Sequence, residues 1–365
     1  MPEQSIHSER RSRAAALLAT LNPKQPLDCL VVSGRENVRY LTGFTGSNSM
    51  LLVFADGRSI LYTDPRYTIQ AEQQADCRVK IAKGSLTTEL MDDFDRSGKL
   101  WIAVEKEHLT IGAFEAFTKI LPARAAVEAV AGPVEKLRMV KDAGEIELIR
   151  QSVILNSAAF EAALKRVKAG ITETDVAAEI DYRSRKLGAD GPAFETIVAA
   201  GEHAALPHAQ PGLAKIGPGM LLIDMGAFLG GYASDMTRMV HIGKAPARYR
   251  KAYKAVQEAQ LAAFDKVKAG VTSKAVDAVT RKTLKAHGLD KEFVHSTGHG
   301  LGLEIHEAPR IGRKDSTKLE AGMVITIEPG VYFEGWGGIR IEDTVLVTKT
   351  GCEILTPTSK EQIEI

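Results

Sequence analysis

Two aspartates stand on either side of a glycine-rich turn in LLIDMGAFLGGYASDMTRMV, residues 221–240. The apolar runs around the glycines predict antiparallel strands, and a turn centred on Leu229 and Gly230 would place Asp224 directly opposite Asp235. Two carboxylates at that spacing repel each other strongly where they are partly buried. Cations between them would remove the repulsion, and oxygen ligands favour ions such as Mn²⁺, Mg²⁺ or Ca²⁺.

A second acidic pair occurs near the C-terminus in MVITIEPGVYFEGWGGIRIEDTVLV, residues 323–347. We expect Glu328 to end one strand and Glu342 to lie within the next, with Arg340 on the face of Glu342 because strand side chains alternate. Either acidic pair alone is more often a solvated sheet face than a metal site. The presence of both pairs in matching halves of the sequence favours metal binding.

Three of the nine histidines fall in the glycine-rich segment HSTGHGLGLEIHEAP, residues 295–309. An imidazole such as that of His299 can add a nitrogen ligand to four carboxylates, and the glycines let the backbone approach the ions. A phosphate-binding loop is the rival interpretation, but the segment lacks the Walker lysine pattern. Two divalent ions about 3.5–4 Å apart could activate a water as the nucleophile of a hydrolase.

The elements that would position these residues form an internal repeat. VKAGITETDVAAEIDYRSRKLGAD (167–190) matches VKAGVTSKAVDAVTRKTLKAHGLD (267–290), and GMLLIDMG (219–226) weakly resembles GMVITIEPG (322–330). Each copy indicates helices followed by a strand that ends on a carboxylate. We therefore expect two similar halves that face each other, with the chemistry in the cleft between them.

The first part of the chain has the alternating strand and helix pattern of a small α/β domain. The expected elements are a helix at 9–21, a buried strand at 27–34, a hairpin at 49–64 with its turn at Asp56-Gly57, and a strand at 100–106.

A domain boundary is expected near Pro133. Asp142 and Glu145 then form a capping-box pattern that opens a long helix, which Gly170 is expected to end. The predicted domains are residues 1–132 and residues 133–365.

The overall composition excludes several classes of function. The formal net charge is +1, without the basic excess of a nucleic-acid binder or of a protein that binds anionic membranes. The three cysteines form no CxxC pair and favour free thiols in a reducing compartment. No apolar run approaches the ~20 residues of a membrane helix, and the N-terminal segment lacks the apolar core of a signal peptide. We expect a cytoplasmic protein with no nucleic-acid or membrane partner.

The motifs together resemble the pita-bread metallopeptidases, which include methionine aminopeptidase, Xaa-Pro aminopeptidase and Xaa-Pro dipeptidase (prolidase). The resemblance implies an α/β N-terminal domain plus an α+β C-terminal pita-bread domain with an internal pseudo-twofold repeat. It also implies two divalent metal ions, with Mn²⁺ favoured and Co²⁺ or Zn²⁺ as alternatives. Asp235 and Glu342 would bridge the ions, Asp224 would serve one ion, and His299 with Glu328 would serve the other.

The N-terminal part carries the resemblance to the Xaa-Pro branch. ENVRYLTGFTGSNSMLLV (36–53) and YTDPRYTIQAEQ (62–73) resemble the N-terminal domain of Xaa-Pro peptidases and of creatinase, which methionine aminopeptidases generally lack. In the family this domain closes one side of the substrate pocket, often across a dimer interface, which implies a homodimer. A purely structural role of the domain stays open. Creatinase keeps the fold without the metal ligands, so the intact ligands argue against it.

Further residues carry over from the Xaa-Pro branch. His208 in GEHAALPHAQP and His306 in IHEAP match substrate-contacting and catalytic histidines, and His295 matches a third histidine beside the site. Arg340 is assigned to substrate binding. His203 stands where a small polar residue such as Asn is expected, which leaves the substrate preference open.

The motifs DPRYTIQAEQ and GWGGIRIED favour a short bacterial Xaa-Pro aminopeptidase, with Xaa-Pro dipeptidase as the alternative. The expected reaction is hydrolysis of the bond between an N-terminal residue and a following proline in short peptides, through a hydroxide activated by two metal ions. Glu328 would carry the proton, while His306 and His208 stabilise the oxyanion or position the substrate. A non-catalytic binding protein on this fold, or a hydrolase of non-proline amides or a carboxypeptidase, are the other possibilities.

Overall fold

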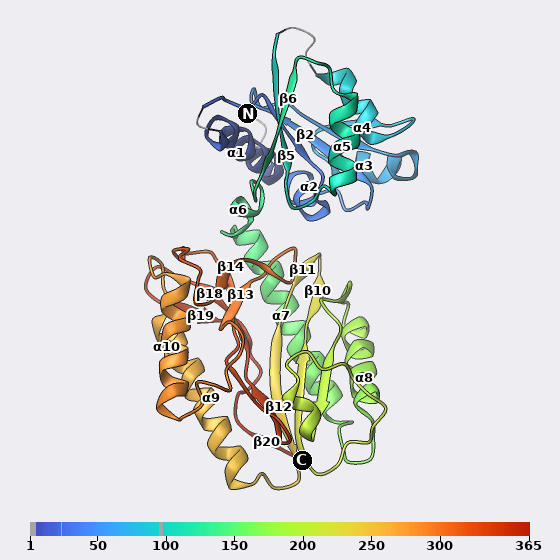
Figure 1. Cartoon of the computed structure of the whole chain (residues 1–365). Coiled ribbons are helices and arrows are strands. Elements are labelled where there is room, and N and C mark those ends of the chain that lie inside the picture. The colour runs from blue at the N-terminus through green and yellow to red at the C-terminus, as the bar shows by residue number, and fades with distance from the viewer. Residues whose placement is uncertain (1–4, 23, 95–97) are drawn as a thin grey trace. The chain divides into compact units, whose positions relative to one another are not determined.

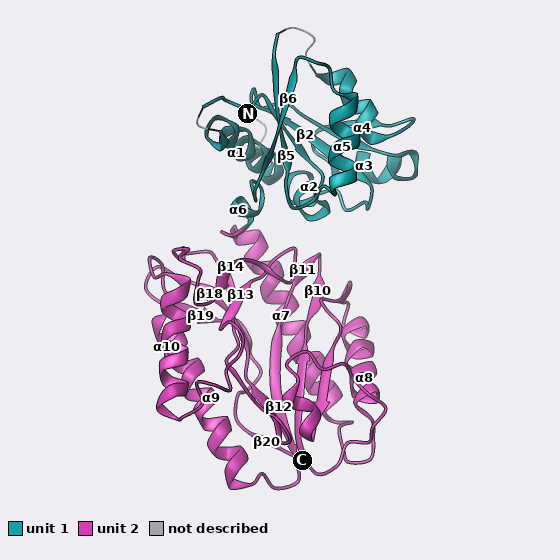
Figure 2. Cartoon of the chain, in the orientation of Figure 1, with its two compact units in different colours: residues 1–138 teal, residues 139–365 magenta. Residues whose placement is uncertain are grey.

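The computed structural model describes residues 5–22, 24–94 and 98–365, and the chain divides into two compact units, residues 1–138 and residues 139–365 (Figures 1 and 2). The boundary expected from the sequence lies slightly earlier, between residues 132 and 133. Each unit has its own hydrophobic core. Among the described residues, none of the helices combines the length and the apolar character that crossing a bilayer requires.

Unit 1 (residues 1–138) is built on a six-stranded mixed sheet in the order β4-β3-β2-β1-β5-β6. Its strands are β1 (Cys29–Val32), β2 (Ser49–Phe54), β3 (Ser59–Thr63), β4 (Arg78–Ile81), β5 (Leu100–Glu105) and β6 (Ala125–Val130). Its helices are α1 (Ile6–Leu21), α2 (Arg35–Thr42), η1 (Pro65–Tyr67), α3 (Thr68–Gln74), α4 (Leu86–Glu89), η2 (Leu90–Asp93), α5 (Ile111–Ile120) and α6 (Glu135–Arg138).

The β2–β3 hairpin confirms the expectation for residues 49–64. The two strands pair antiparallel, and Gly57 in the turn has φ +88°, a conformation that glycine adopts without a steric penalty. All four side chains of β1 are buried, as expected for the apolar run at 27–34. The core of unit 1 gathers buried apolar side chains from the sheet, with Phe117 of α5 packed among them.

Unit 2 (residues 139–365) places long helices around antiparallel strands; in Figure 1, α9 and α10 lie to the left of the strands and α8 to their right. Its helices are α7 (Ala143–Leu164), α8 (Glu173–Lys186), η3 (Gly201–Ala205), α9 (Ala247–Lys266) and α10 (Ser273–Ala286). Its strands are β7 (Gly191–Pro192), β8 (Ile197–Ala200), β9 (Gly219–Met225), β10 (Ala227–Leu229), β11 (Tyr232–Ala233), β12 (Met236–Ile242), β13 (Gly298–Gly300), β14 (Glu307–Ile311), β15 (Val324–Ile327), β16 (Gly330–Phe333), β17 (Gly337–Arg340), β18 (Asp343–Val347), β19 (Cys352–Ile354) and β20 (Ile363–Glu364).

The internal repeat is visible in the elements of unit 2. Helix α10 starts and ends one hundred residues after α8, and each is preceded by an equivalent isolated bridge, Thr172 with Lys215 and Thr272 with Lys318. The two halves contribute the sheets β20-β12-β9-β8 and β14-β13-β15-β18-β19. Strand β9 carries Asp224, and β15 leads directly into Glu328.

Helix α7 begins as expected but ends earlier than expected. Asp142 and Glu145 form a complete capping box, each side chain accepting the backbone N–H of the other residue over 3.0 Å. The helix ends at Leu164, so the expectation that Gly170 ends it is wrong. Val167 is buried in the hydrophobic cluster to which α8 contributes, and the chain leaves the helix to place it there. Gly170, with φ +93°, forms a separate turn before α8.

Candidate metal centre

Asp224 and Asp235 come from the two sides of one hairpin, in a register that differs from the expected one. Strand β9 pairs antiparallel with β12, and Asp224 lies opposite Thr237, so the expected direct opposition of the two aspartates is wrong. The turn is centred on Gly230 and Gly231, whose φ values of +55° and +77° suit a tight two-residue hairpin. Asp235 therefore lies diagonally from Asp224, two residues before Thr237.

Glu328 directly follows β15, and Glu342 lies between β17 and β18 instead of within a strand as expected. The hydroxyl of Thr237 donates to Oε2 of Glu342 over 2.7 Å, and Nε of Arg340 donates to the same hydroxyl over 3.1 Å. The backbone N–H of Glu342 also donates to the carbonyl of Thr237 over 3.2 Å. These bonds fix Glu342 against the strand that follows Asp235.

His299 brings a nitrogen lone pair to the carboxylates. Its Nδ1 lies 3.0 Å from the carbonyl oxygen of Gly300, which places the ring proton on Nδ1. Its Nε2 lies 3.5 Å from Oδ2 of Asp235 and 3.6 Å from Oε1 of Glu328. Burial lowers the pKa of His299 to about 4, so the ring is neutral at pH 7. A neutral lone pair that faces two carboxylates calls for a cation between them.

The carboxylates of this site are buried close together. Burial, followed by the charges of Glu342 and Asp224, raises the pKa of Asp235 well above its usual range. Burial and neighbouring charges raise the pKa of Glu342 in the same way, and burial raises the pKa of Glu328 to about 8. Among the described residues, Oδ1 of Asp224 is buried without a hydrogen-bond partner. We name Asp224, Asp235, His299, Glu328 and Glu342 the candidate metal centre.

The donor set of the candidate metal centre fits divalent cations. Ligand atoms of Asp235, His299 and Glu342 all lie within 4.8 Å of one another. Hard or borderline divalent ions prefer carboxylate oxygens, complemented here by one imidazole. Such ions would also supply the positive charge that the buried carboxylates lack.

Arg340 supplies one positive charge and orients a chain of polar groups. Its Nη2 donates to Oδ2 of Asp224 over 2.5 Å, and its Nη1 donates to the hydroxyl of Tyr332 over 2.7 Å. The Tyr332 hydroxyl lies 3.0 Å from Nε2 of His295, and Nδ1 of His295 lies 2.8 Å from the carbonyl oxygen of Ser296. One guanidinium cannot balance four carboxylates, so Arg340 does not remove the need for further cations.

His208 and His306 face the same cavity as these residues. The ring of His306 lies 4.4 Å from the ring of His299, edge to face, and burial lowers the pKa of His306. Asp235 and Glu342 belong to the candidate metal centre beside the cavity. The cavity of about 350 Å³ is lined by Pro207, His208, Asp224, His295, Ser296, His299, His306, Glu307, Arg310, Glu328 and Arg340. Unit 2 thus brings all the site residues predicted from the sequence into one region.

Several residues of the site were not anticipated from the sequence. Thr237 lies two residues after Asp235. Because strand side chains alternate, the two side chains share a face, and this spacing could have indicated that Thr237 contacts the acidic group. Tyr332 and Arg310 offered no such signal, because only the fold brings Arg310 to the cavity and Tyr332 into contact with His295 and Arg340. His203 is not among the residues that line the cavity, and its Nδ1 lies 2.9 Å from Oε2 of Glu173.

Comparisons with known proteins cover both units. A family model described as Metallopeptidase family M24 matches residues 147–349, and one described as Creatinase/Prolidase N-terminal domain matches residues 10–140. A curated Xaa-Pro dipeptidase of Pyrococcus horikoshii is 34% identical over 343 residues, which cover 93% of this chain and 95% of the relative.

Two solved structures share nearly the whole fold. The Xaa-Pro dipeptidase from Bacillus anthracis matches with a TM-score of 0.93 and 34% identity, covering 98% of this chain and 100% of that chain. The X-Pro aminopeptidase from Thermotoga maritima MSB8 matches with a TM-score of 0.87 and 36% identity, covering 97% of this chain and 100% of that chain. The expected fold class and the expected class of metallo-exopeptidase are confirmed. The chain belongs to metallopeptidase family M24, and this membership implies divalent metal ions.

Proposed function

We propose that this protein is an Xaa-Pro dipeptidase, which hydrolyses the bond between the first residue and the proline of a dipeptide. The similarity to the Xaa-Pro dipeptidases of Pyrococcus horikoshii and Bacillus anthracis over nearly the whole chain supports this function. It favours the dipeptidase over the aminopeptidase that the sequence motifs suggested.

The observation that carries this proposal is the position of Arg310. Its side chain lines the cavity of the candidate metal centre, and its Nε donates to the hydroxyl of Ser296 over 3.3 Å. Among the described residues it forms no ion pair. The guanidinium is therefore available for the C-terminal carboxylate of a dipeptide, which it can bind through charge-assisted hydrogen bonds.

For the cofactor we propose two divalent metal ions, with Mn²⁺ favoured and Co²⁺ or Zn²⁺ as alternatives. Asp224, Asp235, His299, Glu328 and Glu342 would hold them, and Asp235 and Glu342 are the ligands proposed to serve both. The oxygen-rich donor set supports this role, as does the buried Oδ1 of Asp224, which has no hydrogen-bond partner within the described ranges. When bound, the ions supply a water of lowered pKa as the nucleophile and polarise the substrate carbonyl.

The side chains around the candidate metal centre would transfer the proton, stabilise the oxyanion and bind the substrate. Glu328 accepts the proton of the attacking water and returns it to the proline nitrogen as the C–N bond breaks. His306 and His208, on the wall of the cavity, donate N–H groups to the carbonyl oxygen as it gains negative charge. Arg340 and His295 would contact the substrate, and Arg340 also orients Asp224 through its hydrogen bond to Oδ2. Proline has no backbone N–H, and none of these steps requires one.

An Xaa-Pro aminopeptidase is the second candidate function. A broad groove of about 970 Å³ shares His295, Ser296 and Arg310 with the wall of the catalytic cavity. It continues past Arg313 and Lys314 and offers room in unit 2 for residues that follow the proline. The similarity to the X-Pro aminopeptidase from Thermotoga maritima also supports this candidate.

Product analysis on Ala-Pro, Ala-Pro-Ala and Ala-Ala decides between the two functions. The dipeptidase proposal expects rapid release of proline from Ala-Pro and little turnover of the other two peptides. Arg310→Gln should raise KM for Ala-Pro by roughly 10- to 100-fold without loss of metal, because a charge-assisted pair is removed. Arg313→Gln is the matched control, because Arg313 lines the broad groove but not the catalytic cavity, and it should change KM for Ala-Pro little. Faster turnover of Ala-Pro-Ala, with Arg310→Gln neutral for Ala-Pro, would establish the aminopeptidase instead.

A further inference from the structure

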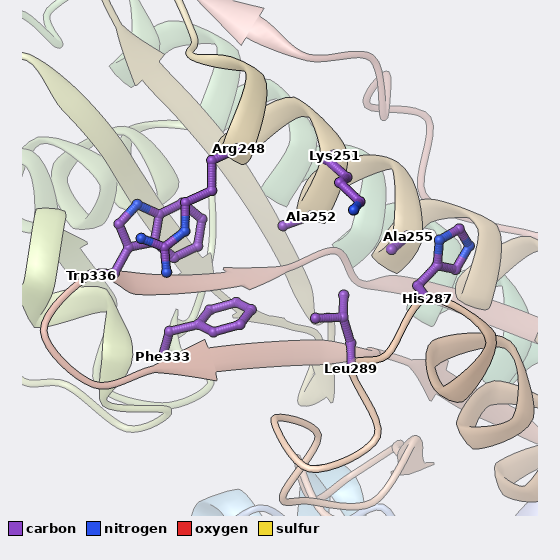
Figure 3. Close-up of a pocket in the computed structure, with 8 residues that line it drawn as sticks. All are labelled: Arg248, Lys251, Ala252, Ala255, His287, Leu289, Phe333 and Trp336. Carbon is purple, nitrogen blue, oxygen red and sulfur yellow. The ribbon is translucent and has the colours of Figure 1, made fainter.

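A second pocket of unit 2 lies between helix α9 and the β16–β17 hairpin (Figure 3). It has a volume of about 160 Å³. None of its lining residues lines the cavity of the candidate metal centre. The same hairpin carries Tyr332 and Arg340, and Arg340 lines the cavity of the candidate metal centre. The two cavities therefore lie against one hairpin but have no lining residue in common.

The inside of this pocket is lined by apolar side chains, and two small residues on α9 leave the space open. Ala252 and Ala255 are buried on the helix face toward the pocket, and the absence of larger side chains there leaves the space open. Phe333 and Trp336 form the opposite wall, with ring centroids 5.1 Å apart in an edge-to-face arrangement. Leu289 closes the end of the pocket near α10. Such a surface suits a hydrocarbon body, flat or branched.

Two cations stand at the edge of this apolar space. The guanidinium of Arg248 lies 4.1 Å from the centroid of the Trp336 ring, a cation–π contact that holds it over the pocket. Lys251 follows one helical turn later on α9 and also lines the pocket. Neither side chain forms an ion pair within the described part of the chain.

The nearby acidic residues form no ion pair with these two cations among the described residues. Glu334, between Phe333 and Trp336 in the hairpin turn, is exposed. Glu258 is the nearest acidic residue on the same helix, and it is already engaged by Nε2 of His287 at 2.6 Å and by Nζ of Lys254 at 3.7 Å. Both Arg248 and Lys251 lie in the first turns of α9, where the positive end of the helix dipole adds to their field. The pocket therefore offers an apolar interior with two cations at its edge that form no ion pair among the described residues.

We propose that this pocket is a ligand site, separate from the metal centre, for a small monocarboxylate with an apolar body. The hydrocarbon part fills the space between the two alanines and the Phe333–Trp336 pair. The carboxylate meets Arg248 and Lys251 at the edge, where it accepts charge-assisted hydrogen bonds. A neutral ligand of the same shape keeps the apolar contact and loses the charge pairing.

The chain provides its own reporter for this test, because it has only two tryptophans. Trp101→Phe leaves Trp336 as the single tryptophan, inside the proposed site, and excitation at the red edge of the absorption avoids the tyrosines. The Mn²⁺-loaded full-length variant is titrated with phenylacetate and, separately, with neutral phenylethanol. We expect saturable changes in Trp336 emission with a Kd on the order of 1 mM for phenylacetate, the affinity typical of a ligand of this size. Phenylethanol should bind at least about 5-fold more weakly.

Substitutions at the pocket edge test the charge pairing. Arg248→Gln and Lys251→Gln, both at exposed positions, should each weaken phenylacetate binding by roughly 3- to 10-fold and leave phenylethanol unchanged. Lys254→Gln, one turn along on the same helix and outside the pocket, is the matched control and should leave both affinities unchanged. Hydrolysis of Ala-Pro should be the same in all three variants.

Three results would overturn the proposal. The first is equal affinity for phenylacetate and phenylethanol, and the second is equal weakening by Lys254→Gln and by the two edge variants. The third is Trp336 emission that depends on protein concentration and ignores phenylacetate, which would identify this face as a contact between two copies of the chain. Ala-Pro hydrolysis in the same preparations tests the proposed dipeptidase separately.

Discussion

Two groups of acidic residues and a histidine in this chain have similarly close ligand atoms but differ in how many hydrogen-bond donors surround them. In unit 1, ligand atoms of Glu105, His108 and Glu135 lie within 4.8 Å of one another, and the candidate metal centre of unit 2 contains a triplet that meets the same distance. Distance alone would assign a metal to both groups. The hydrogen-bond donors around each group separate them.

In unit 1 an amide group occupies the position between the carboxylates. Nδ2 of Asn37 donates to Oε1 of Glu105 and to Oε1 of Glu135, each over 2.6 Å. Nη1 of Arg138 donates to Oδ1 of Asn37 over 2.7 Å, which fixes the amide with its N–H groups toward the acids. The other oxygen of Glu105 accepts two backbone N–H groups, from residues 33 and 34. A donor therefore stands where a cation would have to bind.

In the candidate metal centre, Glu342 and Asp224 each accept one side-chain donor, but other acceptors of the group face one another without any in the described part of the chain. Oδ1 of Asp224 has no donor among the described residues, and Nε2 of His299 directs a lone pair at two carboxylates. Buried acceptors that face one another without donors are costly unless a cation joins them. By the count of donors, the group in unit 2 fits a cation and the group in unit 1 does not, although the ligand atoms are equally close in both.

The largest expected effect is the loss of metal from unit 2 when a shared ligand is removed. Asp235→Asn keeps the shape of the side chain but removes the charge proposed to serve both ions. We expect loss of bound Mn²⁺, measured by inductively coupled plasma mass spectrometry, and hydrolysis of Ala-Pro reduced by at least about 10³-fold.

Glu135→Gln is the matched control for this prediction, because it likewise replaces a carboxylate by the neutral amide of the same shape, in the unit 1 group. Metal content and hydrolysis should stay at the wild-type level. Retention of two ions by Asp235→Asn, or loss of metal from Glu135→Gln, would break the contrast between the two groups.

A smaller effect is expected where a residue of unit 2 acts on the substrate without holding an ion. His306 lines the cavity, and its ring packs edge to face against the ring of the proposed ligand His299. His306→Ala should keep the fold and both ions and lower kcat by roughly 10²–10³-fold, the effect of removing one transition-state donor. Metal content and kcat are measured on one preparation. Unchanged kcat would make His306 structural, and lost metal would make it a ligand.

The smallest expected effect is a pH dependence of stability with opposite signs in the two units. In metal-free unit 2, burial raises the pKa of Glu328 from 4.5 to about 8, so the folded state binds protons that the unfolded state releases. Stability should therefore fall as pH rises from 4.5 toward 8. Saturating Mn²⁺ should raise the unfolding temperature by roughly 5–10 °C at pH 8 and by less at pH 5. Trp336 emission in Trp101→Phe reports this unfolding.

In unit 1 the pH dependence of stability is expected to have the opposite sign, because the pKa of Glu135 is lowered. Burial alone would raise the pKa of Glu135, but hydrogen bonds from His108 and Asn37 outweigh it and lower the pKa to about 2. Its contribution to stability is present above the ordinary value of 4.5 and is lost as pH falls toward 2. Glu135→Gln should remove this loss, followed through Trp101 in a Trp336→Phe background. A rise in the stability of unit 1 toward pH 2 would contradict the hydrogen-bond account.

The sequence predicted those features whose signals are local or repeated. The capping box of Asp142 and Glu145 is four residues long, and the copy of α8 in α10 is a match at constant spacing. The acidic hairpins were recognised from their motifs. In the first hairpin the turn was placed one residue too early, at Leu229-Gly230 where the structure has Gly230-Gly231, and this shifted the expected partner of Asp224 by two residues, from Thr237 to Asp235. Only the φ values of the two glycines distinguish the two turns.

The features that the sequence did not predict depend on contacts between distant segments. Asn37 and Glu105 are 68 residues apart, and they meet because β1 and β5 pair in parallel. Arg310 reaches the cavity, and Tyr332 reaches His295 on its wall, only through the packing of the second half of unit 2. Neither residue type is rare enough for its sequence position to mark a function.

Crystals of the Mn²⁺-loaded protein, measured at the manganese absorption edge, test the central contrast most directly. We predict two anomalous peaks among Asp224, Asp235, His299, Glu328 and Glu342, and none among Glu105, His108 and Glu135. A peak in the unit 1 group, or the absence of any peak in the candidate metal centre, would contradict it.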